Sequence, residues 1–418
     1  MHILFLTDNF PPEVNAPASR TMEHCREWAR QGHKVTVITC APNFPSGKVF
    51  AGYRNRLWHQ ETMEGVEVVR IWTYITANEG FLRRTLDYVS FMFAAFLAAP
   101  FVRDADVVVA TSPQFFTACA GYLVGTLKRR PFVFELRDLW PESIRAVGVL
   151  KDGLILYALE RIEMFLYHHA AAIVAVTHSF RDSLITRGID EEKIVVVTNG
   201  ADLDRFHPAP KDPQLAARLG LEGKIVAGYV GTHGLAHALH TILEAADHVA
   251  KVSDGKNVIF LFLGDGAMKA ELKAKAAVMG LENAVFLDTV PKADVPRYWS
   301  LIDISIIHLK RDPLFTNVIP SKLFECMAMG LPVLHGVAGE SASIVEKEQA
   351  GLLFEPESAV DLAAKVLLLA QNEQLRMRLG QNGRSVAPRY DRKARAAEML
   401  SVLTKVIYPA QANSDGVA

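Results

Sequence analysis

The chain has 418 residues, of which 50% are hydrophobic and 22% are charged, and its formal net charge at pH 7 is −1. This length predicts two domains of about 200 residues each, and the composition excludes an intrinsically disordered chain. The near-neutral charge does not favour general binding to nucleic acid. The four cysteines are far apart and fit no metal-binding spacing, so we expect reduced thiols in a cytoplasmic protein without a signal peptide.

Short β-branched runs alternate with helical stretches or loops in the first half of the chain. The predicted strands are 2–7, 34–40, 66–72, 107–111, 132–137, 173–177 and 194–198. Continuous apolar strands separated by helices are typical of a parallel sheet that is covered on both faces. The segment 199–210 contains Gly, Asp and two Pro residues, and we expect it to be a linker.

The same pattern begins again after the linker. Its predicted strands are 225–231, 258–264, 285–287, 304–309, 333–335 and 352–354. Helices between them carry apolar stripes at three-and-four spacing, for example Leu239, Ile242, Leu243, Ala246 and Val249. We therefore expect two doubly wound α/β domains, with ligands bound where the carboxyl ends of the strands open.

The segment 320–333 is the most informative part of the sequence. It predicts a loop, a two-turn helix that begins at Ser321 and Lys322, a stop at Gly330 and a buried strand. The start of a helix offers unpaired N–H groups and a positive dipole end to an anion, and Lys322 adds a cation. Glu325 lies one turn further on and could accept hydrogen bonds from a sugar diol. The segment thus predicts a site for a diphosphate and a ribose, against a solvated lysine and a surface glutamate as the alternatives.

Two glycine-containing turns follow the first two strands of the second half. They are Gly231-Thr232-His233-Gly234 and Gly264-Asp265-Gly266. Small residues at such turns let the backbone approach a phosphate, although the spacing is not the dinucleotide-binding fingerprint. An ordinary strand-to-helix turn remains the alternative for either segment alone.

These motifs, with 9–13 (NFPPE) and 137–142 (RDLWPE), resemble the nucleotide-sugar glycosyltransferases of family four. The similarity is to their bacterial cell-surface branch, the N-acetylfucosamine or quinovosamine transferase-like enzymes, and it spans most of residues 1–390. It implies the GT-B fold, in which two Rossmann-like domains face a central cleft. Residues 1–200 would form the acceptor-side domain and 201–390 the nucleotide-sugar domain, while a helix at 391–408 would pack back on the first domain. Residues 409–418 are expected to form a flexible tail.

The resemblance also implies which residues bind the donor. They are Gly231, Thr232, His233, Gly234, Gly264, Gly266, Val290, Pro320, Ser321, Lys322, Leu323 and Glu325. Relatives often place an Arg and a Lys in the first glycine loop, where this chain has Thr232 and His237. Lys322, with help from Arg20, would then supply the charge for the diphosphate. Asn317 stands where relatives often have a glutamate, so it could bind a donor-sugar hydroxyl or acetamido group without carrying a charge.

Four residues of the first half are expected at the cleft on the acceptor side: Asn15, Ala16, Arg20 and Arg137. Asn15 and Ala16 replace the Gly-Gly of relatives, and Arg137 replaces a histidine that contacts the donor sugar. Arg20, opening the next helix, could reach an anion or be an ordinary surface arginine. Asp138 could accept a proton from the acceptor or orient the donor, and the alternative is a helix-capping aspartate. The candidate catalytic residues are therefore Asp138, Lys322 and Asn317.

Residues 88–102 form an apolar run of fifteen residues without a charge. This run is shorter than the roughly 20 residues that a membrane-spanning helix needs. Arg83, Arg84 and Arg103 flank it. A helix buried under the sheet and a peripheral membrane contact through 81–103 both fit this pattern.

The predicted function is that of a metal-independent, retaining glycosyltransferase without a cofactor. It would move a sugar, expected to be an N-acetylated amino sugar, from a UDP-linked donor to a lipid-diphosphate-linked saccharide at the cytoplasmic membrane face. The product would enter a surface polysaccharide such as O-antigen or capsule. Two alternatives stay open: a nucleotide-sugar epimerase of the same architecture, and a non-catalytic membrane-associated partner protein that has kept the fold.

Overall fold

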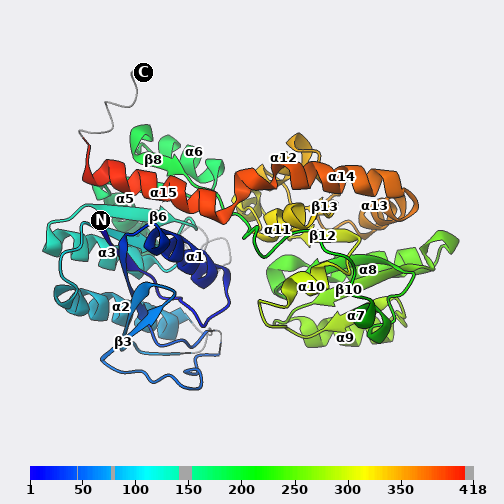
Figure 1. Cartoon of the computed structure of the whole chain (residues 1–418), viewed down its shortest axis with the longest axis horizontal. Coiled ribbons are helices and arrows are strands. Elements are labelled where there is room, and N and C mark those ends of the chain that lie inside the picture. The colour runs from blue at the N-terminus through cyan, green and yellow to red at the C-terminus, as the bar shows by residue number, and fades with distance from the viewer. Residues whose placement is uncertain (45, 77–80, 141–152, 410–418) are drawn as a thin grey trace. The chain divides into compact units, whose positions relative to one another are not determined.

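The computed structural model describes residues 1–44, 46–76, 81–140 and 153–409. The chain forms two compact units, one of Met1–Thr198 with Arg392–Ala418 and the other of Asn199–Asp391. Each unit is an α/β body built on its own sheet, as predicted (Figure 1). Pro141 and Glu142 of the RDLWPE motif, and the expected tail beyond 409, lie outside the described residues.

The first unit contains an eight-stranded sheet in the order β3-β4-β2-β1-β5-β6-β7-β8. Its strands are β1 (His2–Leu6), β2 (Lys34–Cys40), β3 (Trp58–Met63), β4 (Val66–Ile71), β5 (Val107–Thr111), β6 (Phe132–Leu136), β7 (Ala172–Ala175) and β8 (Ile194–Val196). The seven strands predicted for this half are all present and parallel. The prediction missed β3, an antiparallel edge strand that pairs with β4. All six residues of β3 are exposed or half-exposed.

Helices cover both faces of this sheet. The two that cover one face, α1 (Ala16–Arg30) and α15 (Arg392–Ile407), share a core with β1 and β5. The indole Nε1 of Trp28 on α1 donates a 2.8 Å hydrogen bond to the carbonyl of Ala396 on α15, and Arg392 forms an ion pair with Glu23. The other face is covered by α2 (Phe81–Ala98), α3 (Phe115–Lys128), α5 (Leu154–His169) and α6 (His178–Thr186). The C-terminal helix therefore covers a sheet whose last strand, β8, ends almost 200 residues earlier in the chain.

The second unit contains a six-stranded, fully parallel sheet in the order β11-β10-β9-β12-β13-β14. Its strands are β9 (Ile225–Val230), β10 (Val258–Leu263), β11 (Ala284–Leu287), β12 (Ile304–His308), β13 (Val333–Gly336) and β14 (Gly351–Leu353). The helices are α7 (Pro213–Arg218), α8 (His240–Ala250), α9 (Lys269–Val278), α10 (Val295–Trp299), α11 (Lys322–Met329), α12 (Glu340–Lys347), α13 (Ala359–Gln371) and α14 (Glu373–Val386). All six predicted strands are present, and the predicted apolar stripe on α8 is buried.

The apolar run at 88–102 has two different sides. It lies in α2 and in the short 3-10 helix Ala99–Phe101 that follows. Phe91 is fully buried against the sheet, whereas Phe93 is 57% exposed and Phe101 is 74% exposed. The interpretation as a helix buried under the sheet therefore holds for one side of this segment, and a membrane contact of the other side stays a prediction. Within the described ranges, no helix has both the length and the hydropathy that crossing a membrane requires.

Arg20 is part of the interior of the first unit. It lies in the second turn of α1 and is only 4% exposed, so it does not open the helix, and the alternative of an ordinary surface arginine is wrong. Its Nε donates to Glu135 Oε1 at 2.9 Å, and its Nη1 and Nη2 donate to the carbonyls of Thr198 and Val197 at 2.9 and 3.0 Å. The guanidinium charge is thus engaged within the unit, which removes the reason to expect Arg20 to help Lys322 hold a diphosphate.

Replacing Arg20 by Met should destabilise the protein by about 3–5 kcal/mol, because Glu135 would be left buried without its cation. The free energy of unfolding in urea measures this loss. Lys34→Met is a matched control, since Lys34 and Glu67 form an ion pair at 3.8 Å with side chains 56% and 39% exposed. Such exposed pairs contribute at most about 1 kcal/mol. Equal effects of the two substitutions would contradict the structural role of Arg20.

Candidate functional site

The two glycine turns of the second unit touch each other at the carboxyl edge of the sheet. Gly231 follows β9 and Gly264 follows β10, and the Gly231 N–H donates to the Leu263 carbonyl at 2.9 Å. Gly264 has a φ of +143°, and a Cβ there would lie 2.0 Å from the Gly231 oxygen. A side chain at Gly264 is therefore impossible without moving the first loop. The close approach of the two loops thus requires glycine at position 264.

Lys322, the first residue of α11, points its ammonium group into the first loop. Its Nζ lies 4.0 Å from the centroid of the Tyr229 ring, and a Cβ on Gly231 would lie 2.7 Å from the same atom. Nζ is buried and has no hydrogen-bond partner in the described part of the chain. Burial lowers the pKa of Lys322 to about 8, against the opposing effects of Cys326 and Glu325. The alternative interpretation of Lys322 as a solvated lysine is therefore wrong.

Two histidines surround the same aromatic ring. The rings of His233 and His237 each lie 5.9 Å from that of Tyr229, and the Tyr229 hydroxyl donates to the Thr232 carbonyl at 2.8 Å. Burial lowers the pKa of His233 to about 4 and that of His237 to about 3, with nearby lysines adding to the effect. Both nitrogens of His233 and Nδ1 of His237 are buried without a partner among the described residues. Sequence reasoning missed Tyr229, the residue around which this group is arranged.

The first turn of α11 is tighter than expected. Leu323 N donates to the Pro320 carbonyl at 3.0 Å and Phe324 N donates to the Ser321 carbonyl at 3.2 Å. Two of the first N–H groups are therefore used within the chain, which corrects the expectation that the whole first turn is free. Ser321 and Glu325 are half-buried at this end of the helix, and Leu323 is fully buried. Ligand contact here would come from Ser321, Lys322 and Glu325 rather than from Leu323.

The other predicted donor residues lie in separate loops of the second unit. Gly234 is the N-cap of a short 3-10 helix, Leu235–His237, and Gly266 N donates to the carboxylate of Asp265 at 2.8 Å. Asn317 ends the 3-10 helix Pro313–Asn317 and is half-buried. Val290 follows β11 and is also half-buried. The contacts of these residues with a ligand stay a prediction.

Lys269 is a further buried lysine that the sequence did not single out. It begins α9 and is 7% exposed. Its Nζ donates to the carbonyls of Gly264 and Leu287 at 2.7 and 3.0 Å and to Asp288 Oδ1 at 2.5 Å. Because three acceptors already surround this ammonium group, we assign Lys269 to holding the second glycine loop. Lys322, in contrast, has no such acceptor in the described chain.

In the first unit, Arg137 and Asp138 follow β6 at the carboxyl edge of that sheet. The Ser112 hydroxyl accepts hydrogen bonds from both backbone N–H groups, at 2.7 and 3.2 Å, and so fixes this turn. Nη1 of Arg137 is buried without a hydrogen-bond partner in the described ranges. Burial lowers the pKa of Arg137 to about 10, with Glu135 opposing the shift. Both side chains are half-buried overall.

The loop after β1 holds the other predicted acceptor-side residues. Asn15 caps α1 by accepting from Ala18 N at 2.9 Å, and Ala16 is exposed. Sequence reasoning missed two acids in this loop. Burial raises the pKa of Asp8 to about 6 and that of Glu13 to about 7, although Glu13 accepts hydrogen bonds from the N–H groups of Asn43 and Phe44.

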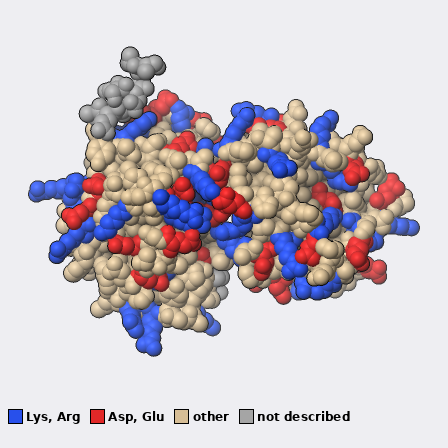
Figure 2. Space-filling view, in the orientation of Figure 1, with Lys and Arg blue, Asp and Glu red and all other residues tan. Residues whose placement is uncertain are grey.

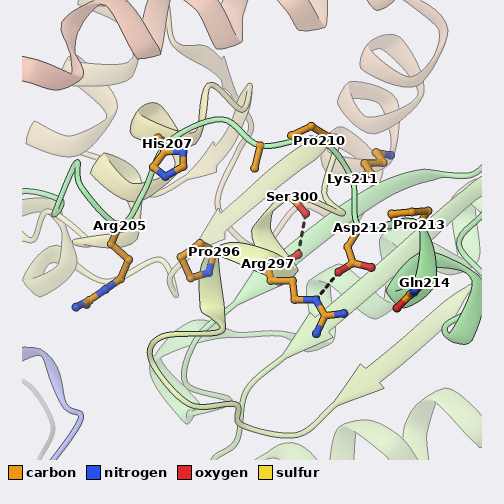
Figure 3. Close-up of a pocket in the computed structure, with 11 residues that line it drawn as sticks. Arg205, His207, Pro210, Lys211, Asp212, Pro213, Gln214, Pro296, Arg297 and Ser300 are labelled. Atoms are coloured by element: carbon orange, nitrogen blue, oxygen red, sulfur yellow. Dashed lines mark hydrogen bonds and ion pairs between the residues drawn. The ribbon is translucent and has the colours of Figure 1, made fainter.

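A separate open pocket lies beside the linker in the second unit (Figure 3). None of its eleven lining residues is a predicted donor residue. Its positive groups are already paired, since Arg297 contacts Asp212, Lys211 contacts Asp303 at 2.6 Å and Arg205 lies 3.8 Å from Asp202. This pairing leaves the pocket without the unpaired charge that distinguishes the Lys322 site.

Two protein-family models match the chain, one in each half. Residues 15–200 match the glycosyl transferase 4-like domain, and residues 212–386 match the glycosyl transferases group 1. Each half of the chain is therefore similar to a glycosyltransferase domain. The two matches together reach from the loop after β1 to the end of α14.

Several known proteins with similar sequences are named as glycosyltransferases. WcaI of Escherichia coli (strain K12), assigned to colanic acid biosynthesis, is 27% identical over 339 residues, which are 79% of this chain and 82% of WcaI. The GDP-mannose-dependent alpha-mannosyltransferase of Mycobacterium tuberculosis is 24% identical over 85% of this chain and 84% of its own length. CapM of Staphylococcus aureus, from capsular polysaccharide biosynthesis, is 23% identical over 63% of this chain and 67% of its own length.

Solved structures establish the fold as GT-B. Sucrose-phosphate synthase from Thermosynechococcus elongatus matches with a TM-score of 0.80 at 15% identity, over 98% of this chain and 100% of the other. Anabaena HepE in complex with UDP and glucose matches with a TM-score of 0.72 at 18% identity, over 96% and 99%. WaaG, a glycosyltransferase of lipopolysaccharide biosynthesis, matches with a TM-score of 0.69 at 16% identity, over 96% and 99%.

Replacing Lys322 by Met should stabilise the ligand-free transferase by about 1–3 kcal/mol, because the substitution removes a buried charge that has no partner. The gain should be largest below pH 8, where the folded protein must keep Lys322 charged. It should shrink between pH 8 and 10.5, the ordinary pKa of a lysine, since the folded state releases this proton at a lower pH than the unfolded state does. Thermal unfolding of both proteins across this pH range measures the difference.

The exposed residue Lys347, at the end of α12, supplies the control. Lys347→Met should change stability by less than about 0.5 kcal/mol at every pH. A loss of stability in Lys322→Met would show that the ammonium group is satisfied in the ligand-free protein, and would contradict the site described above.

Proposed function

We propose that this chain is a group 1 glycosyltransferase that binds the diphosphate of a UDP-linked sugar at Lys322 and transfers the sugar with retention of configuration, without a metal ion. The observation that carries the proposal is the buried Nζ of Lys322, which has no hydrogen-bond partner among the described residues and lies beside Gly231. Proteins seldom bury a charge without a partner, because its desolvation is costly. A diphosphate oxygen next to the Gly231 loop would supply the missing partner.

The chemistry of the leaving group fits these surroundings. Negative charge grows on the diphosphate as the glycosidic bond breaks, and fixed positive groups and N–H donors stabilise it most in a site that excludes water. Lys322 provides the formal charge, and the amino end of α11 adds its dipole. His233 and His237 would donate hydrogen bonds as neutral rings, since burial holds their pKa values near 4 and 3.

Similar proteins support the finer parts of the proposal. The HepE structures contain UDP, UDP with glucose, or UDP-glucose, which favours a UDP-linked donor. WcaI is assigned to colanic acid biosynthesis, CapM to capsular polysaccharide biosynthesis and WaaG to lipopolysaccharide biosynthesis. We therefore propose a lipid-linked saccharide acceptor in the making of O-antigen, capsule or a related polymer. An N-acetylated amino sugar as the transferred group rests on the sequence resemblance, with Asn317 as the amide that would bind it.

Ligand-induced melting shifts test the donor site directly. With EDTA present, UDP or a UDP-sugar should raise the melting temperature, since a ligand at 100 times its Kd stabilises the native state by about 2.7 kcal/mol. The panel needs UDP, UDP-N-acetylglucosamine, GDP and GDP-mannose. Lys322→Ala should weaken UDP binding at least about tenfold, whereas Lys347→Ala should not change it. No shift with any nucleotide would favour the non-catalytic alternative, and interconversion of the sugar without an acceptor would favour the epimerase.

Asp138 is proposed to receive the acceptor proton or to orient the donor, from a turn that Ser112 fixes. Asp138→Asn keeps the shape but loses the basic carboxylate, so turnover should fall about 100-fold or more if Asp138 is the base. The release of UDP from the donor, followed in a coupled assay, measures turnover. Unchanged turnover of the Asp138→Asn variant would contradict a catalytic role and would favour the alternative, a structural role of Asp138 at the turn.

A further inference from the structure

The outer surface of the α2, α3 and α5 layer carries an unusual number of exposed apolar side chains. On α2 and the 3-10 helix after it, Leu86, Phe93, Leu97 and Phe101 are 57%, 57%, 68% and 74% exposed. On α5, Leu154, Ile155 and Tyr157 are 88%, 64% and 60% exposed. Exposed apolar residues are ordinary when scattered, but a continuous group of them marks a contact surface.

Side-chain contacts join these helices into one layer. α2 packs on α3, and α3 packs on α5. Tyr122 of α3 meets Phe165 of α5 edge-on, with ring centroids 5.1 Å apart. At the other end, Phe101 meets Trp58 of the edge strand β3, with centroids 5.8 Å apart. We call the exposed apolar side chains of α2, the following 3-10 helix, α3 and α5, together with Trp58, the apolar face.

The charges around the apolar face are strongly biased. In the described parts of 81–130 and 153–169, six arginines are exposed: Arg83, Arg84, Arg103, Arg129, Arg130 and Arg161. Of the acids in these described ranges, Asp104 is exposed, Asp106 and Glu160 are half-buried, and Asp87 and Glu163 are buried. Figure 2 shows the lower left of the molecule, where Figure 1 labels α2, as largely uncharged, with Lys and Arg projecting at the left edge and the bottom.

We propose that the apolar face binds the surface of an anionic lipid bilayer, with its aromatic and aliphatic side chains at the level of the head groups and its arginines on the lipid phosphates. Apolar area and positive charge are the two signals that together give a stable peripheral contact. A second copy of the chain is a poorer occupant, because a two-fold contact would set arginines against arginines. This inference deepens the proposed function, since it states where the enzyme meets a lipid-borne acceptor.

The surface is wider than the run at 81–103 that the sequence suggested. The three most exposed large apolar residues of α5 lie about 50 residues beyond that run in the chain, on a helix that α3 connects to α2. The α5 residues therefore give the sharpest test, because a membrane contact through 81–103 alone would not involve them. The double substitution Ile155→Ser/Tyr157→Ser replaces two exposed side chains, so it should leave the packing of the core nearly unchanged.

Co-sedimentation with vesicles tests the proposal on the full chain. Wild-type protein should bind vesicles of phosphatidylcholine with phosphatidylglycerol, bind pure phosphatidylcholine at least about tenfold more weakly, and release at high salt. Phe93→Ser/Leu97→Ser, Ile155→Ser/Tyr157→Ser and Arg130→Glu/Arg161→Glu should each reduce binding at least about tenfold. Val278→Ser/Val360→Ser, at residues 89% and 67% exposed in the second unit, should not.

Each sample also receives a UDP melting-shift measurement, which separates a failed membrane contact from a failed donor site. Wild-type protein that shows the UDP shift but ignores anionic vesicles would overturn the proposal. An α5 variant that binds vesicles as wild type does would overturn the three-helix surface. A dimer in sedimentation velocity that the Phe93→Ser/Leu97→Ser variant abolishes would instead identify the apolar face as a contact between two copies.

Discussion

The proposed donor site depends on one interaction, the contact of the Lys322 ammonium group with the face of the Tyr229 ring. The ring is 4.0 Å away, and in the described chain Nζ has no hydrogen-bond acceptor. A cation over an aromatic ring gains about 1–2 kcal/mol, which is less than the cost of removing an ammonium group from water. The Lys322 ammonium group would therefore be stabilised further by an anionic ligand. The close contact of the two glycine turns fixes the backbone beside the Lys322 ammonium group. Lys269 in turn holds the second of these turns.

The buried cations of the described chain differ in whether the fold itself supplies their hydrogen-bond partners. Arg20 has Glu135 and two carbonyls as partners, and Lys269 has three oxygen acceptors, so both charges are satisfied within the fold. Lys322 Nζ and Arg137 Nη1 are buried without such partners among the described residues. An unsatisfied buried group lowers stability, and a protein keeps it where a ligand completes it. Arg137 belongs to the first unit and Lys322 to the second, and each lies at the carboxyl edge of its own sheet.

Much of the fold could be predicted from the sequence, because continuous apolar runs such as 107–111 and 304–309 leave few alternatives to buried parallel strands. The strand β3 was missed for a physical reason: Trp58–Met63 is a polar edge strand whose residues are all exposed or half-exposed. Lys322 could be recognised because a Ser-Lys pair at a helix start is a local pattern. The position of Arg20 could not, since its partner Glu135 lies 115 residues away. Tyr229 was missed because only the packed structure shows which side chains surround its ring.

Calorimetric titration with uridine, UMP and UDP tests the central claim most directly, because it separates the phosphates from the nucleoside. If Lys322 holds the diphosphate, UDP should bind wild-type protein at least about tenfold more tightly than uridine, and this difference should largely disappear in Lys322→Met. UDP affinity should also fall above pH 8, where free Lys322 loses its proton. A preference for UDP over uridine that is equal in both proteins would contradict the account, because the diphosphate would then be held elsewhere.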